Sequence, residues 1–251
     1  MNDRFLINPN LPENKVTTVY AHIDDNKLEN IFKELSIKVI PVRQNELLDH
    51  PISQHADILC NYVGKSNFLV DNNQNKLCKF IEYNNGKSVI IENIKSPYPN
   101  DCLLNFANIG DYIICNKSIL SEEIVKYLPK KPIIDVKQGY SKCSVCICGH
   151  NTVITDDKSV YNAVLQYNNI NALLIGKGSV RINKYDYGFI GGCCGLIDRN
   201  LLFFNGDLSL HSDFDKIKNF LYDNDIKYID IKGKPLTDIG SIIPIREIDG
   251  D

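Results

Sequence analysis

Hydrophobic and polar residues follow one pattern that recurs five times along the chain. Each copy contains an amphipathic helix, a short apolar strand, a gap and an apolar hairpin. When Asp57, Asp101, Lys142, Gly192 and Asp238 are taken as equivalent positions at which the hairpins open, the steps are 44, 41, 50 and 46 residues. Self-similarity with a period of roughly 20 to 50 residues is typical of solenoids, propellers and arrays. The repeat therefore predicts a ring in which residues at the strand ends of all five copies meet.

Five helices and five buried strands are expected at one phase of this repeat. Asp24 and Asp25 can cap the first helix, whose apolar residues follow helical spacing over 28–35. The other helices are expected near 77–81, after Ser121, after Asp156 or Asp157, and after Ser212, which with Asp215 resembles a capping box. Each helix leads into an apolar run rich in β-branched residues, which predicts a strand. These runs are Lys38–Val42, Ser88–Ile91, Ile133–Val136, Ala172–Ile175 and Tyr228–Ile231.

The hairpins and the two ends of the sequence favour a closed ring. Gly, Asn and Asp turns at 108–110, 149–151 and 198–200 separate apolar runs, as in hairpins. The fifth hairpin has only its first strand, Ile239–Ile245, whereas Lys15–His22 is a strand without a partner ahead of it. Pairing these two would remove two free edges. We therefore expect one domain over residues 1–251, a five-bladed pseudo-fivefold α/β propeller closed by its N- and C-terminal strands. The alternative is an open α/β sheet with coincidental spacing.

Composition narrows the class of protein. The formal net charge is −3 and the pI is near 6, which argues against nucleic acid as the main partner. The sequence has no signal-peptide-like start and no apolar run of about 18 residues, so no membrane association is expected. The cysteine count is nine, an odd number, and several cysteines lie in apolar strands. We expect them to be reduced thiols in a cytoplasmic protein of undefined oligomeric state.

Four segments carry a family resemblance: YPNDCLLNFANIGDYIICN, YDYGFIGGCCGLID, NLLFFNGDLSLH and PLTDIGSIIPI. Together with the repeat, they resemble an uncharacterised bacterial family with the pentein fold, that of the guanidino-group-modifying enzymes. The resemblance covers nearly the whole chain. It implies a deiminase-, amidinotransferase- or hydrolase-like activity on a guanidino compound. The same fold also has a non-enzymatic, ribosome-binding branch.

The resemblance implies a catalytic cysteine in the last unit and a histidine in an H-x-D/E motif in a middle unit. The chain departs from both. The last hairpin reads Asp238-Ile-Gly-Ser241 without a cysteine, and the third unit has Lys142 and Cys143 instead of H-x-D. Two related forms occur elsewhere, His55-Ala-Asp57 in the first hairpin and Gly191-Gly-Cys-Cys194 in the fourth.

Strand alternation selects among the candidate residues. Side chains in a strand alternate faces with a period of two. If the equivalent positions face the axis, His55, Asp57, Asp101, Lys142, Cys194 and Asp238 share that face. Cys102, Cys143 and Cys193 would then point outward, unless a bulge at Gly191-Gly192 reverses the choice between Cys193 and Cys194. We therefore predict Cys194 and His55 as catalytic residues, and Asp57, Asp101, Lys142 and Asp238 as substrate-binding residues. Three carboxylates and one ammonium suit a small cationic molecule.

No metal or cofactor is expected from the remaining motifs. Cys143, Cys146, Cys148 and His150 could suggest zinc, but the first two would lie on opposite faces of a strand and no second C-x-x-C follows. Gly176-Lys-Gly178-Ser lacks the spacing of a phosphate-binding loop. Two functions remain: an enzyme that modifies a guanidino or amidino compound through a cysteine, and a binding protein that has lost the nucleophile.

Overall fold

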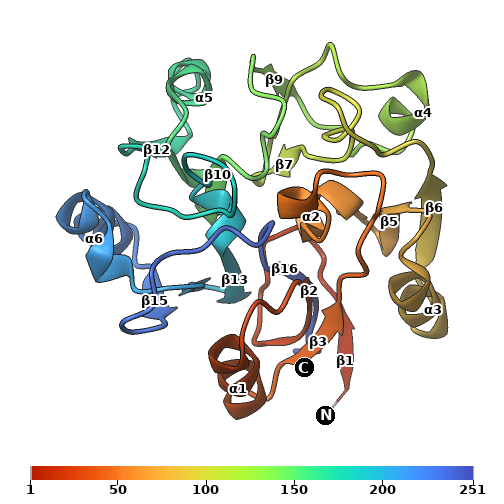
Figure 1. Ribbon diagram of the computed structural model, residues 1–251, viewed down its shortest axis with the longest axis horizontal. Helices are drawn as coiled ribbons and strands as arrows, with labels where there is room; N and C mark the ends of the chain where they lie inside the picture. The colour runs from red at the N-terminus through yellow and green to blue at the C-terminus, as the bar shows by residue number, and fades with distance from the viewer. Residues whose placement is uncertain (1, 251) are drawn as a thin grey trace.

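The computed structural model describes residues 2–250 and contains five small β-sheets around a common centre, with the longer helices outside them (Figure 1). Four sheets have the same order: an antiparallel pair, then a helix, then a third strand parallel to the second. The first two units are β4 (Cys60–Gly64), β5 (Asn67–Asp71), α3 (Asn75–Tyr83) and β6 (Lys87–Ile91), then β7 (Ala107–Asn108), β8 (Ile113–Cys115), α4 (Glu122–Val125) and β9 (Ile133–Asp135). The next two are β10 (Val145–Gly149), β11 (Thr152–Thr155), α5 (Lys158–Val164) and β12 (Asn171–Leu174), then β13 (Cys194–Asp198), β14 (Leu201–Phe204), α6 (Phe214–Asp223) and β15 (Lys227–Asp230).

The fifth sheet combines both ends of the chain. Its order is β1 (Asp3–Phe5), β16 (Ile243–Ile248), β2 (Val16–Ala21), β3 (Lys38–Pro41), with α1 (Asn26–Glu34) between β2 and β3. β16 runs antiparallel to β2 and completes the same strand–strand–helix–strand unit. The predicted pairing of the terminal strands is confirmed, although β16 begins four residues later than expected. Among residues 2–250 no strand ladder joins one sheet to the next. Neighbouring units contact each other through side chains and through separate backbone hydrogen bonds, such as the one from the Ile242 N–H to the Cys194 carbonyl at 3.0 Å.

The helices begin close to the predicted positions. Asp25 caps α1 by accepting a hydrogen bond from the Leu28 N–H, and Asp157 caps α5. The predicted capping box at Ser212 is wrong, because Asp213 is the N-cap of α6 and the Ser212 hydroxyl lies 3.1 Å from that of Ser179. No helix within residues 2–250 is long and apolar enough to cross a membrane.

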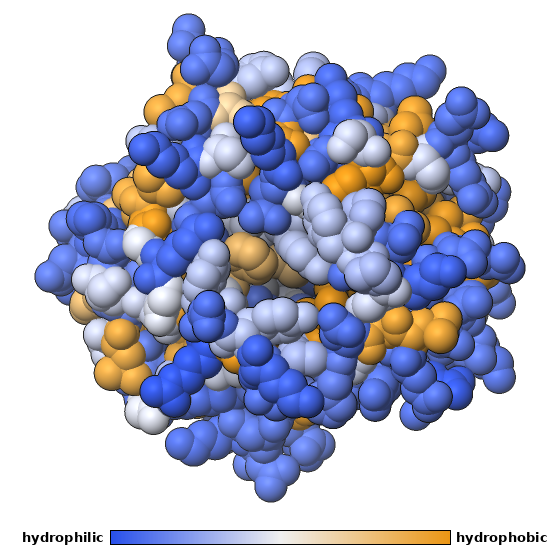
Figure 2. Space-filling view, turned by 45° about the horizontal axis from the view of Figure 1, so that its top comes forward, coloured by the Kyte–Doolittle hydropathy of each residue, from blue (hydrophilic) through white to orange (hydrophobic). Residues whose placement is uncertain are grey.

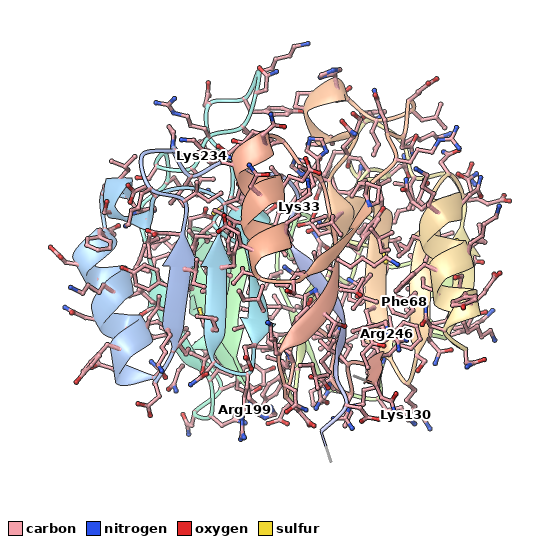
Figure 3. The ribbon with its side chains drawn as sticks, turned by 90° about the horizontal axis from the view of Figure 1, so that it is seen from below. Lys33, Phe68, Lys130, Arg199, Lys234 and Arg246 are labelled. Carbon is pink, nitrogen blue, oxygen red and sulfur yellow. The ribbon has the colours of Figure 1, made fainter. Side chains whose placement is uncertain are left out.

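The side view in Figure 3 shows strands running between two faces, one near Lys234 and the other near Arg199. Arg199 lies in the turn that follows β13, so the first strand of each unit begins at the Lys234 face. The segments before these strands form turns and short helices, including η1 (His50–Ile52), α2 (Ala56–Leu59), η2 (Gly191–Cys193) and, in the loop before α6, η3 (Leu208–Leu210). These segments carry the predicted site residues.

Candidate active site

The five equivalent positions lie in these entry segments and are buried. His55 is the N-cap of α2 and Asp57 lies within that helix, where the sequence predicted the opening of a hairpin. Lys142 lies in a turn before β10 and Gly192 in η2. The expectation that these residues follow strand alternation is therefore wrong, because Asp57, Lys142 and Gly192 lie in a short helix, a turn and a 3-10 helix instead of in extended strands.

Asp57 is the hub of a buried polar network. The Cys143 thiol lies 3.2 and 3.1 Å from the two Asp57 carboxylate oxygens, to which it can donate a hydrogen bond. The Ser241 hydroxyl lies 2.5 Å from Asp57 Oδ2 and accepts a hydrogen bond from Lys142 Nζ at 3.0 Å. First, third and last units are thus joined through Asp57, with the Lys142 ammonium as a buried counter-charge.

Asn105, from the second unit, fixes the turn that carries the thiol. Its Oδ1 accepts hydrogen bonds from the backbone N–H groups of Lys142 (2.8 Å) and Cys143 (3.1 Å). Its Nδ2 donates to the Asp57 carbonyl at 3.1 Å and to the Cys143 sulfur at 3.2 Å. The amide therefore holds the thiol against α2.

Asp238 is buried beside His55 in a space that small residues leave open. Its carboxylate accepts hydrogen bonds from the N–H groups of Phe189 (2.9 Å) and Gly240 (3.0 Å). His55 Nδ1 lies 3.7 Å from Asp238 Oδ1. A Cβ at Gly192 would lie 2.0 Å from the same oxygen, so glycine is required there. Burial raises the pKa of Asp238 to about 6, although both N–H groups and Lys142 oppose that shift.

Asp101 stands apart from this cluster. Its Oδ2 accepts a hydrogen bond from the Tyr140 hydroxyl at 2.8 Å, and burial raises the pKa of its carboxyl group. Asp101 reaches the site through Tyr140, whose ring lines the cavity described next.

A cavity of about 290 Å³ opens over this cluster. Figure 2 shows the surface hollowed near its centre, where pale and orange residues meet. The cavity wall comprises three ionisable site groups, a segment rich in aromatic residues and several apolar residues. In full, it is lined by Ile52, His55, Ile58, Tyr140, Cys143, Ile182, Tyr185, Asp186, Tyr187, Gly188, Phe189 and Asp238.

Cys143 is the cysteine that lines this cavity, contrary to its predicted outward orientation. Cys194 is buried with its sulfur 3.8 Å from the Gly191 carbonyl oxygen, and is absent from the cavity wall. The physical reason is local. Residues 141–144 form a turn, in which adjacent Lys142 and Cys143 both reach the central network.

The electrostatics of the free protein favour neutral forms of the thiol and imidazole. Burial raises the pKa of the Cys143 thiol well above its ordinary value, and the charges of Asp57 and Asp238 raise it further. Burial lowers the pKa of His55 to about 4, against the opposing effect of Asp57. A bound cation would reverse part of the rise in the pKa of Cys143, because positive charge near a thiol favours the thiolate.

Comparison with known proteins adds a family and a fold. Residues 20–243 match the model of a family of unknown function, DUF6873. The chain belongs to DUF6873. No curated protein matches it in sequence.

Solved structures show that this DUF6873 protein has the pentein fold. It is similar to the amidinotransferase SxtG of the saxitoxin biosynthetic pathway from Microseira wollei, with 9% identity over 97% of this chain and 98% of that chain, and a TM-score of 0.61. Inosamine-phosphate amidinotransferase StrB1 from Streptomyces griseus gives 10% identity over 98% of each chain and a TM-score of 0.60. Agmatine deiminase from C. jejuni gives 13% identity over 100% of this chain and 98% of that chain, and a TM-score of 0.53.

The DUF6873 structure also brings together one set of metal-type ligands that the sequence did not single out. Donor atoms of His55, Asp57 and Cys143 lie within 4.8 Å of one another, and all three are ligand types that zinc accepts. The cluster considered from sequence is different: the exposed His150 imidazole lies 3.3 Å from Asp111, away from the buried Cys146 and Cys148.

Several residues of the DUF6873 site were missed by sequence reasoning. Asn105 and Ser241 were visible only as members of the repeated hairpin openings. Tyr185, Tyr187 and Phe189 belong to the segment YDYGF, whose aromatic density was the available signal.

Proposed function

We propose that this protein modifies a guanidino or amidino compound through a covalent cysteine intermediate. Cys143 is the nucleophile, His55 the general acid and base, and Asp57 and Asp238 hold the cation. The observation that carries the proposal is the joint placement of a thiol, an imidazole and a carboxylate on one cavity wall, with a second carboxylate 3.1 Å from the thiol.

The chemistry explains why these groups are needed together. A guanidinium carbon is a poor electrophile, so attack requires a thiolate and carboxylates that bind the cation in a planar grip. When the cation binds, the Cys143 proton passes to neutral His55 and the sulfur attacks the central carbon. The C–N bond to the departing nitrogen then breaks, and that nitrogen takes the proton from His55. The resulting S-linked amidinium is released by water in a hydrolase or by an amine in a transferase.

The positions of these groups in the repeat also support the proposal. The pentein resemblance implies a cysteine in the last unit and H-x-D in a middle one. Here the third unit supplies Cys143 and the first supplies His55-Ala-Asp57, so the separation between cysteine and histidine remains two units. In a pseudo-fivefold ring, moving both groups by the same number of units keeps their relative placement. In the last unit, where the resemblance implies the cysteine, this chain has Ser241. In the third unit, where the resemblance implies the histidine motif, it has Lys142, whose ammonium group hydrogen bonds to the Ser241 hydroxyl.

Asp101 and Lys142 act indirectly in this scheme. Asp101 holds the hydroxyl of Tyr140 at the cavity, and Lys142 balances the buried carboxylates through Ser241. The link from Lys142 through Ser241 to Asp57 is also the observation that favours the second function, a non-catalytic binding protein. The Lys142 ammonium, acting through Ser241, already neutralises part of the charge of Asp57, which is one of the two carboxylates that would hold a ligand.

A cationic affinity label tests the choice of function and of cysteine. 2-Chloroacetamidine carries an amidinium group and a displaceable chloride, whereas 2-chloroacetamide is its neutral counterpart. After brief exposure near pH 7 and peptide mapping, we expect the amidine to label Cys143 at least ten times faster than the amide does. The cation both binds the carboxylates and lowers the pKa of the thiol.

Two variants control this experiment. Cys194→Ser should retain labelling, and Cys143→Ser should lose it while the protein keeps its melting temperature within a few degrees. Equal rates with both reagents, or preferential labelling of Cys194, would contradict the proposed site. Selective labelling without turnover of any guanidino compound would favour the binding protein.

A further inference from the structure

The residues of the cavity wall indicate which chemical groups the rest of the ligand carries beyond its guanidinium head. We infer, on the basis of the proposed function, that the substrate is a small alkylguanidine without a carboxylate, whose chain ends in a second cationic group facing Asp186. The inference concerns the tail of the ligand, whereas the proposed function concerns its head.

The wall offers no cation to a ligand carboxylate. None of its twelve residues is lysine or arginine, and its acidic members are Asp186 and Asp238. The nearby Lys142 ammonium is hydrogen bonded to Ser241. A carboxylate entering this space would lose water and approach two like charges without an ion-pair partner, which is unfavourable on both counts.

One basic residue beside the aromatic wall is also engaged. Lys177 Nζ donates to the Tyr187 hydroxyl at 3.2 Å and lies 5.1 Å from the centre of that ring. Lys177 does not line the cavity, and its ammonium group contacts Tyr187 instead of facing a ligand in the cavity.

Aromatic and aliphatic side chains match an alkyl chain between two cationic ends. The Phe189 ring lies between those of Tyr140 and Tyr187, at centroid distances of 6.3 and 6.1 Å. Aromatic faces attract flat cations such as guanidinium, and Ile52, Ile58 and Ile182 can contact methylene groups. A volume of about 290 Å³ lies at the lower end of the roughly 300–1,000 Å³ usual for ligand pockets, so the molecule is small.

Asp186 belongs to the segment that supplies half of this wall. Six lining residues fall within 182–189, and Asp186 is exposed at the rim. The segment is anchored to the floor, because the Phe189 N–H donates to Asp238 and the Gly188 N–H donates to the Val180 carbonyl at 2.8 Å. A ligand held by Asp238 therefore has its outer end near a wall that carries a second carboxylate.

Three probes with one guanidinium head separate the contributions of the tail. Agmatine ends in an ammonium group, n-butylguanidine in a methyl group, and arginine carries both an ammonium and a carboxylate. Calorimetric titration of the whole protein should give agmatine an affinity at least tenfold above that of arginine. Asp186→Asn should weaken agmatine three- to tenfold and change n-butylguanidine by less than twofold. Asp223→Asn, on the remote helix α6, should change neither.

The outcomes distinguish this inference from the proposed function. If arginine binds as tightly as agmatine, or if Asp186→Asn weakens both amine-bearing and amine-free probes equally, the inference about the tail is wrong. Selective amidine labelling of Cys143 would leave the proposed function standing in that case. If none of the guanidines binds and 2-chloroacetamidine labels Cys143 no faster than 2-chloroacetamide does, both the inference about the tail and the proposed function are wrong.

Discussion

At the scale of single residues, most polar groups at the centre of the molecule hydrogen bond to one another, and the buried His55 Nδ1 has no hydrogen-bond partner among residues 2–250. Buried carboxylates and backbone N–H groups are costly when they lack partners. Asn105 is an example, because its one side-chain amide hydrogen bonds to two backbone N–H groups, a carbonyl and a thiol. Replacing such a residue exposes how much the site depends on it.

Asn105→Leu should destabilise the protein by about 2–4 kcal/mol, because the buried Cys143 N–H loses its acceptor and the Asp57 carbonyl loses its amide donor, while the Lys142 N–H keeps only its 3.3 Å bond to the Asn105 carbonyl. Urea denaturation measures this change. Asn84→Ala is the matched control: Asn84 caps the end of α3 and donates to the Phe80 carbonyl, so its loss should cost below about 1 kcal/mol. Similar losses in the two variants would contradict the role given to Asn105.

Asp156 gives a pH-dependent prediction at the same scale. Burial raises its pKa from 3.8 to about 7, helped by the charge of Asp238 and opposed by the Ile190 N–H and Lys177. Between those pH values the folded state binds more protons than the unfolded state, so stability falls as pH rises.

Asp156→Asn removes this titration. The free energy of unfolding of the variant minus that of the parent should therefore increase from pH 4 to pH 8, by on the order of 2–4 kcal/mol. Chemical denaturation at both pH values measures the difference. A difference that stays constant or shrinks toward pH 8 would show that Asp156 is ionised in the folded protein at low cost.

At the scale of elements, the sequence was sufficient for the regular parts of each unit and insufficient for their entrances. The strands predicted at Ile133–Val136 and Tyr228–Ile231 became β9 and β15 within one residue at each end, because apolar β-branched runs between turns leave few alternatives. The site lies in the segments before the first strand of each unit. The conformation of these segments depends on hydrogen bonds between polar side chains of distant units, and no hydrophobic pattern in the sequence marks it.

The choice of cysteine shows the physical limit of the pattern. Alternation with period two requires extended backbone, but Cys143 lies in a turn that Asn105 closes from another unit. Gly191-Gly192 likewise form η2 ahead of Cys194. These conformations depend on tertiary hydrogen bonds, which spacing along one chain does not encode. The set of units that meet was predictable, whereas the direction of each side chain was not.

The terminal sheet gives a prediction about elements. β16 lies between β1 and β2, so deleting residues 243–251 removes an interior strand and exposes two edges. We expect that variant to be unfolded or aggregated by circular dichroism and size-exclusion chromatography. Deleting residues 2–5 removes only the edge strand β1 and should leave a folded, less stable protein. A soluble, cooperatively melting protein without 243–251 would show that the fifth unit does not need β16.

At the scale of the whole molecule, the two ends of the chain lie side by side. The Asp249 N–H donates to the Asn2 carbonyl at 3.0 Å, and Figure 1 shows both ends below the same sheet. Four units have the same connections and the fifth forms the same arrangement from the two ends of the chain, so no unit has to be the first in sequence. The order in which the chain visits the units should be separable from the fold.

A circular permutant tests this separation. Joining residues 2 and 249 through a short glycine-rich linker, and opening the chain at 167–168 between α5 and β12, should preserve the fold and Cys143 labelling. The melting temperature should fall by no more than about 10 °C, since exposed loop sites tolerate new ends. Opening the chain inside β13 should abolish folding. Loss of structure in both permutants would mean that the original connectivity is needed.

The pairing of β2 with β16 also sets the timing of folding during synthesis. Asp3 and Arg246, which form an ion pair across this sheet, are separated by 243 residues. At roughly 5–20 residues per second, a ribosome needs about 12–50 s to add that stretch. Throughout this time Val16–Ala21 has an open edge, while the four units that follow it can already assemble. The nascent chain is therefore an open arc of complete units with one unfinished unit, which Ile243–Ile248 complete when they emerge after the other four.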